Sequence, residues 1–208
     1  MHVAVEPGVQ MSVGIELMPV RWQLSLINLR ETLANCKTLK DRLKPNIAFT
    51  QGDVTAVKCL DPFTHIYMYD IAFTPQVMRA VSEAFNSSST PRYLISYHKP
   101  RTIILKHGFL VNLVTYVPNT SMMGSRQKRT AWVYKRTHRS ERNHAADDAK
   151  GEKVLQESIK VLKRSTRSTY EVWLNRTLKK TLYVNEGVNP REKRCTGKPF
   201  YRGCLVPW

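Results

Sequence analysis

The sequence predicts an α/β fold: a mostly parallel sheet with helices on both faces and a closing antiparallel hairpin. Three observations favour this class. Hydrophobic residues make up 42% of the 208 residues, which is enough to build a core. Short apolar runs of strand length alternate with stretches of helical periodicity. Turn residues separate these stretches, and strands that alternate with helices are typical of parallel sheets.

The first half of the pattern lies between positions 11 and 50. Met11–Glu16 is a short apolar run that ends in an acid, and it predicts a buried strand. Pro19 suits a first helical turn. From Pro19 to Leu43, apolar residues recur every three or four positions, which predicts an amphipathic helix. Lys44–Asn46 should end this helix, and Ile47–Thr50 predicts the next strand.

The second half predicts one helix and four strands. Thr74 and Pro75 form a cap and a first-turn proline, and the helix that they begin should end at Asn86. The predicted strands, each bounded by turn residues, are His65–Tyr69, Tyr93–Tyr97, Phe109–Val117 and Thr130–Tyr134. The last two should form the closing antiparallel pair.

Three acids fall at or just past the ends of predicted strands: Glu16, Asp53 and Asp70. In open α/β sheets, ligands bind beyond the carboxyl ends of the strands. Glu16 suits a ribose, because one carboxylate accepts hydrogen bonds from two adjacent hydroxyls. Asp53 suits an adenine amino group. Each acid taken alone would more often be a turn or cap residue.

Positive charge is concentrated in the second part of the chain. Residues 1–123 hold 12 Lys/Arg and 8 Asp/Glu, whereas residues 124–208 hold 21 and 8. The excess indicates a polyanionic partner, such as nucleic acid, a nucleosome or an anionic membrane, with a merely solvated segment as the alternative. Within this part, Asp147–Lys163 predicts a basic amphipathic helix, and Tyr170–Val184 predicts a hairpin. The basic clusters are Arg126–Arg129, Lys135–Arg142, Lys160–Arg167 and Arg191–Arg194.

Several segments resemble class I S-adenosylmethionine-dependent methyltransferases. More narrowly, they resemble the disruptor-of-telomeric-silencing family of non-SET histone H3 lysine methyltransferases. The most specific segment is Ala72–Val77, with its Ala-Phe-x-Pro-x-Val pattern. The resemblance covers roughly residues 3–136. The matching segments are Val13–Glu16, Gln51–Val54, Tyr69–Val77, Leu94–Tyr97 and Gly124–Tyr134.

The resemblance implies S-adenosylmethionine as cofactor and a lysine of the histone H3 core on the nucleosome as methyl acceptor. The cofactor-binding residues that it implies are Gly14, Glu16, Gly52, Asp53, Val54 and Asp70. The catalytic residues that it implies are Asp70, Phe73 and Trp132, with Ile71 and Tyr134 beside the lysine channel. Asp70 stands where the family has an Asn. No metal is expected, because methyl transfer from a sulfonium to an amine is an in-line displacement that relies mainly on positioning.

The resemblance also implies a division of the chain. Residues 1–136 would be a partial methyltransferase domain without the first strand and its Gly-rich loop, since Met1–Pro7 contains no Gly-x-Gly. We therefore expect this chain to bind S-adenosylmethionine weakly or not at all. Residues 137–208 would be a basic extension, partly helical or disordered. The expected partners are the nucleosome with histone H3, and DNA through the basic segment, with no membrane. The expected state is a monomer in the nucleus.

Two other functions stay open. The first is a non-catalytic nucleosome or nucleic-acid binding protein on a degenerate methyltransferase fold. The second is an adenine-directed nucleic-acid methyltransferase, which would need an Asn/Asp-Pro-Pro-aromatic run at Tyr69–Phe73, where this chain has no proline. A zinc site at Cys195 and Cys204 is disfavoured, because there is no second pair of ligands nearby.

Overall fold

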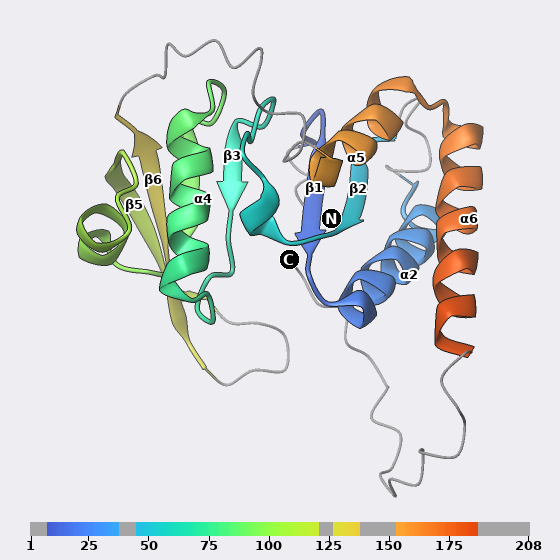
Figure 1. Ribbon diagram of the computed structural model, residues 1–208, viewed down its shortest axis with the longest axis horizontal. Helices are drawn as coiled ribbons and strands as arrows, with labels where there is room; N and C mark the ends of the chain where they lie inside the picture. Colours follow the sequence, from blue (N-terminus) through green and yellow to red (C-terminus); the bar gives the residue numbers. More distant parts are fainter. Residues whose placement is uncertain (1–7, 38–44, 121–126, 138–152, 187–208) are drawn as a thin grey trace, which may run out of the picture. The chain divides into compact units, whose positions relative to one another are not determined.

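The computed structural model describes residues 8–37, 45–120, 127–137 and 153–186 (Figure 1). These residues belong to two compact units. Unit 1 contains the described residues of Met1–Gln51 and Glu157–Trp208, and unit 2 contains those of Gly52–Gln156. No helix within the described ranges is long and apolar enough to cross a membrane.

The sheet of unit 1 is a parallel pair, β1 (Ser12–Glu16) and β2 (Ile47–Gln51), and both predicted strands are confirmed. The expectation that the first strand is buried is wrong, because every residue of β1 is half-buried. The register runs from Ser12 opposite Ile47 to Glu16 opposite Gln51. Parallel strands need a crossover connection, and here α2 (Pro19–Asn35) provides it. The alignment places the carboxyl ends of both strands at one edge of the pair.

Helix α2 begins at Pro19, as predicted. Of its two apolar rows, the one through Leu26 and Leu29 is buried, whereas Val20 and Leu24 are exposed. The helix ends at Asn35, because Cys36 has an extended backbone with φ −91° and ψ 106°. The predicted continuation to Leu43 is therefore wrong at Cys36, and residues 38–44 lie outside the described ranges.

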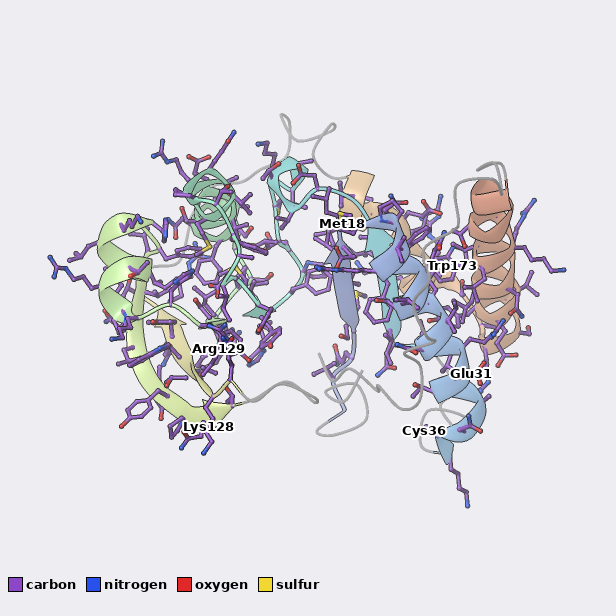
Figure 2. The ribbon with its side chains drawn as sticks, turned by 90° about the horizontal axis from the view of Figure 1, so that it is seen from below. Met18, Glu31, Cys36, Lys128, Arg129 and Trp173 are labelled. Carbon is purple, nitrogen blue, oxygen red and sulfur yellow. The ribbon has the colours of Figure 1, made fainter. Side chains whose placement is uncertain are left out.

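Two further helices complete the core of unit 1. Helix α5 (Lys153–Arg164) confirms the described part of the predicted helix, but α6 (Arg167–Glu186) replaces the predicted hairpin, which was wrong. The Tyr170 hydroxyl donates to the carbonyl of Ile47, and Trp173 lies between α2 and α6 (Figure 2). The chain therefore does not divide into its two units at residue 137, where the resemblance implied a boundary. Helices α5 and α6 follow that position and contribute residues to the core of unit 1. The core of unit 1 is built from Leu26, Leu29, Ile47, Ala48, Phe49, Leu162, Tyr170, Leu174 and Leu178.

Unit 2 contains a four-stranded sheet in the order β3-β4-β6-β5. Its strands are β3 (His65–Tyr67), β4 (Tyr93–Ser96), β5 (Val111–Thr120) and β6 (Arg129–Arg136). β3 and β4 are parallel, whereas β6 is antiparallel to both of its neighbours. The predicted closing hairpin is confirmed. The expected single, mostly parallel sheet is not: the described strands form two sheets, and only the pairs β1–β2 and β3–β4 are parallel.

Helix α4 (Pro75–Ser87) packs against the sheet of unit 2. The Thr74 hydroxyl accepts from the Val77 amide at 3.4 Å and caps the helix, as predicted. Phe85 of α4 is fully buried and meets the Phe109 ring edge-on, with ring centroids 5.8 Å apart. Two short elements were not predicted, a 3₁₀ turn η1 (Val54–Ala56) and a π-helical turn η2 (Arg101–Lys106).

Asp61 fastens the loop before β3 to the loop before β4. Its carboxylate accepts hydrogen bonds from the amide and hydroxyl of Ser89 and from the amide and hydroxyl of Thr90, at 2.7–3.1 Å. Burial raises the pKa of this carboxyl, but the hydrogen bonds from Thr90 and Ser89 outweigh it and lower the pKa to about 2. The ionised form of Asp61 is therefore part of the folded state.

Candidate functional site

Glu16 is the last residue of β1 and lies just before α2. One of its carboxylate oxygens, Oε1, accepts a hydrogen bond from the Met18 amide at 2.9 Å. An acid at the start of a helix satisfies an otherwise unpaired amide and suits the positive end of the helix dipole. The residue is half-buried, so its carboxylate stays accessible at the carboxyl edge of the β1–β2 pair.

Gly14 is required by packing within unit 1. A Cβ on Gly14 would lie 2.6 Å from Cδ1 and 2.8 Å from Cε1 of Phe49, its register partner on β2. Phe49 belongs to the core, so its ring has little room to move. Packing against Phe49 is therefore sufficient to explain why this position holds a glycine.

The segment Gly52–Val54 directly follows β2. A Cβ on Gly52 would lie 2.7 Å from Cγ1 of Val154, so the close approach here is to a side chain of α5. Asp53 is exposed, and its Oδ1 accepts from the Thr55 amide at 2.8 Å, which caps η1. Val54 is half-buried in the same turn. An exposed carboxylate thus lies two residues past the end of β2.

Asp70 is completely buried, and both of its carboxylate oxygens accept hydrogen bonds from β4 and the residue after it. The Ser96 hydroxyl donates to Oδ2, and the Tyr97 amide donates to Oδ1 at 3.0 Å. The backbone carbonyl of Asp70 lies 3.2 Å from His98 Nε2. Asp70 therefore ties the turn after β3 to the end of β4.

The hydrogen-bonded network around Asp70 includes Tyr134 and His98. The Tyr134 hydroxyl donates to the His98 carbonyl at 2.7 Å, and the His98 amide donates to the Ser96 hydroxyl at 3.0 Å. Burial, and then the charge of Asp70, raise the pKa of Tyr134. Tyr134 was expected beside a lysine channel, but it is fully buried and its hydroxyl is engaged with the backbone.

The other two expected catalytic residues lie close to the same network. The Phe73 amide donates to the Asp70 carbonyl at 3.0 Å, and the Phe73 side chain is half-buried. Trp132 of β6 is paired with Ser96 of β4, and its ring lies 5.3 Å from the ring of Tyr116. Ser96 is thus hydrogen-bonded to Asp70 and lies opposite Trp132 in the β4–β6 register, while Phe73 meets Asp70 through its backbone amide.

The expected cofactor-binding residues fall into both units. Gly14 and Glu16 belong to unit 1, whereas Gly52, Asp53, Val54 and Asp70 belong to unit 2. Ser96, Tyr97 and His98 were not predicted as site residues. The sequence feature that could have indicated them is their position at the carboxyl end of a predicted parallel strand, because ligands of open α/β sheets bind there. No group of three or more His, Cys, Asp or Glu side chains in the described ranges could hold a metal ion.

Basic side chains gather on α5 and α6. Lys160, Lys163 and Arg164 are exposed on α5, away from the apolar core. Arg167, from the same predicted cluster, is paired with Glu171 through a 2.9 Å ion pair. On α6 a second basic set is exposed, which was not predicted as a cluster: Arg176, Lys179 and Lys180. Lys128 and Arg129 are consecutive residues at the start of β6, where Lys128 is exposed and Arg129 half-buried (Figure 2).

Solved structures that are similar to this chain include a proposed methyltransferase. No protein-family model matches the chain, and no curated protein matches it. A crystal structure from Streptococcus pneumoniae, of a proposed tRNA (m1A22) methyltransferase in complex with S-adenosyl-L-methionine, is similar with a TM-score of 0.43 and 12% sequence identity. The match covers 89% of this chain and 78% of that one.

Proposed function

We propose that this chain transfers a methyl group from S-adenosylmethionine to a lysine of the histone H3 core on the nucleosome, in the nucleus. The observation that carries the proposal is the place of Glu16, a half-buried acid at the carboxyl end of a parallel strand. An acid at this position suits a ribose diol, because ligands of open α/β sheets bind beyond the carboxyl ends of the strands.

Two of the three strand-end acids fit the cofactor. Glu16 and Asp53 each use one carboxylate oxygen for a nearby amide and remain partly or fully exposed. Glu16 of unit 1 would hold the ribose hydroxyls, and for Asp53 of unit 2 the family resemblance alone assigns the adenine amino group. Asp70 does not fit a direct contact through its carboxylate, because that group is fully buried and accepts from Ser96 and Tyr97.

When bound, the cofactor supplies a methyl group on a positively charged sulfur. The part left to this chain is to present a neutral lysine amine in line with that methyl group. Phe73 and Trp132 offer half-buried aromatic surroundings, and desolvation there disfavours the charged amine and lowers the pKa of a substrate lysine. Most of the rate would come from alignment, which is worth about 7–11 kcal/mol at best. Asp70 would position the Ser96–His98 segment beside Trp132.

A specific observation favours a second candidate, a non-catalytic nucleosome or nucleic-acid binding protein. The buried Asp70 carboxylate is used entirely for joining β3 to β4, and the chain has a formal net charge of +17. Strong positive charge attracts polyanions whether or not methyl transfer takes place. DNA contact through the basic residues after position 124 belongs to both candidates.

Cofactor binding by the full chain tests the enzyme proposal. Ligand-observed NMR detects weak binding, and S-adenosylhomocysteine should displace the bound S-adenosylmethionine. Glu16→Ala should weaken binding by about 1.5–3 kcal/mol, as expected for hydrogen bonds to a charged group. Glu31→Ala, which removes an exposed acid on α2, should leave binding unchanged. Absence of any displaceable signal, or equal binding by Glu16→Ala, would contradict the proposal.

A further inference from the structure

Three tyrosines meet where β3 and β4 end, and none of them was predicted as a site residue. We call Tyr67, Tyr69 and Tyr97 the tyrosine trio. The rings of Tyr67 and Tyr97 are nearly perpendicular, at 84°, with centroids 6.3 Å apart. The rings of Tyr69 and Tyr97 make an angle of 73°, with centroids 5.1 Å apart. Tyr97 is therefore common to two edge-to-face pairs.

Strand register explains why these rings meet. Tyr67 pairs with Ile95 across the parallel β3–β4 ladder, and the Met68 amide continues the ladder by donating to the Ile95 carbonyl at 2.9 Å. Tyr69 and Tyr97 each lie two residues further along. Side chains two residues apart on a strand point to the same side, so Tyr67 and Tyr69 are set to contact Tyr97.

A hydrogen bond between the hydroxyls of Tyr67 and Tyr97, 3.1 Å long, holds the angle between these two rings. The two hydroxyls meet and the rings stand at 84° to each other, so the pair forms a corner. Tyr67 remains 47% exposed, so solvent reaches part of this residue.

The electrostatics of this corner favour a cation. The faces of aromatic rings carry negative charge, and a cation within about 6 Å of a ring centroid is attracted to them. Burial, the Tyr97 hydroxyl, and then the charges of Tyr97, Tyr69 and Asp70 all raise the pKa of Tyr67. The same negative charge of Asp70 that disfavours a tyrosinate favours a nearby cation.

We propose that the tyrosine trio binds an alkylated ammonium group, of the kind carried by a trimethylated lysine side chain. Perpendicular ring pairs can place two aromatic faces against one compact cation. An unmodified ammonium loses strong hydration when it leaves water, and aromatic faces do not replace the hydrogen bonds of its N–H groups. A trimethylated ammonium has no N–H donors and loses less. Recognition of this kind does not depend on methyl transfer.

A stacked nucleobase fits the trio less well. Base stacking uses the flat face of an aromatic ring that is open on one side. In the trio each ring directs its edge or its face toward a neighbour at 73° or 84°, so a planar base would be blocked by the adjoining ring. A compact, roughly spherical cation has no such conflict.

The test is an NMR titration of the full chain, without cofactor, with N-acetyl-trimethyllysine amide. The ring protons of Tyr67, Tyr69 and Tyr97 should shift saturably. The matching lysine amide, and the neutral isostere with carbon in place of the quaternary nitrogen, should bind at least about tenfold more weakly. Equal binding of the neutral isostere, or no shift of the trio, would overturn the proposal. Because no methyl transfer is measured, this result is independent of the enzyme proposal.

Variants localise the binding. Tyr67→Leu and Tyr97→Leu should each lower the affinity at least about fivefold. Tyr116→Leu should not change it, since Tyr116 is an exposed tyrosine of the same unit that packs on Trp132 instead. Tyr67→Phe keeps the ring and removes only the hydroxyl, so its affinity should fall between those of the native chain and Tyr67→Leu. Native affinity in Tyr67→Leu would contradict the assignment. If Tyr67→Leu does not fold, Tyr67→Phe is measured in its place, and native affinity in that variant would contradict the assignment.

Discussion

The Ser96 hydroxyl donates a hydrogen bond to the buried carboxylate of Asp70 and thereby joins the end of β4 to the turn after β3. The neighbouring Tyr97 amide donates to the other oxygen of the same carboxylate. A buried carboxylate needs such donors, because an ionised group without them is very costly to desolvate. The hydrogen bond places a polar network directly beside Trp132, through the Ser96–Trp132 register pair.

Asp70→Ala should destabilise the chain by about 2–3 kcal/mol, because it leaves the Ser96 hydroxyl and the Tyr97 amide without their acceptor. Asp70→Asn keeps an acceptor oxygen for the Tyr97 amide and should cost about half as much. Urea denaturation measures both values. Asp53→Ala, at an exposed cap, is the matched control and should cost about 1 kcal/mol or less. Equal stability of the native chain and Asp70→Ala would contradict the structural role.

The stability that Asp61 provides should depend on pH. Its pKa in the folded state is about 2, below the ordinary 3.8, so its contribution is present above about pH 4. As the pH falls through 3.8 toward 2, the carboxylate becomes protonated and the contribution disappears. Asp61→Asn should therefore lower the unfolding midpoint at pH 7, and the difference from the native chain should shrink between about pH 4 and pH 2. A difference that stays constant over this range would show that the charge is not involved.

Gly14 and Phe49 should be energetically coupled. Gly14→Ala should destabilise unit 1 by about 1–3 kcal/mol, because the new Cβ would lie 2.6 Å from the Phe49 ring. Phe49→Leu creates space and should reduce the cost of the alanine. A double-mutant cycle from denaturation curves gives the coupling energy. If the two changes are simply additive, the close approach of the ring does not explain the glycine.

The exposed basic residues of α5 and α6 should carry salt-dependent binding to duplex DNA. Replacing Lys160, Lys163 and Arg164 by Gln should reduce the slope of log affinity against log salt by up to about 0.9 for each phosphate that is no longer neutralised. Replacing Arg176, Lys179 and Lys180 should have a similar effect. A control with the same reduction of charge in unit 2 should leave the slope unchanged: Lys99, Arg101 and Lys106 to Gln. Equal effects of all three sets would indicate a nonspecific response to net charge.

Elements with one strong periodic signal could be predicted from the sequence. The β1, β2 and α4 segments combine apolar spacing with a proline, a cap or a turn, and the structure confirms each of them. The α6 segment was misread because Tyr170, Val172 and Leu174 alternate as in a strand. The structure instead buries Tyr170, Leu174 and Leu178, which are four residues apart, and leaves Val172 66% exposed. Alternation over so short a stretch does not distinguish a strand from one face of a helix.

The positions of the candidate residues along the strands could be predicted from the sequence, whereas their surroundings could not. Strand ends locate Glu16 and Asp70, because a parallel strand places its final residues at the ligand-binding edge. The sequence does not show that Asp70 is buried, since its partners Ser96 and Tyr97 are distant in the chain and reach it only through the β3–β4 register. The tyrosine trio was missed for the same reason, because the register brings together Tyr67 and Tyr97.

Methyl transfer itself tests the central claim most directly. The full chain is incubated with S-adenosylmethionine labelled in its methyl group, together with nucleosomes, free histone H3, DNA or tRNA, and mass spectrometry locates the label. We predict that the label appears on a lysine of H3 in nucleosomes, and that Glu16→Ala abolishes or strongly reduces it while Glu31→Ala does not. Label on nucleic acid instead of histone, no label on any acceptor, or full transfer by Glu16→Ala would contradict the account.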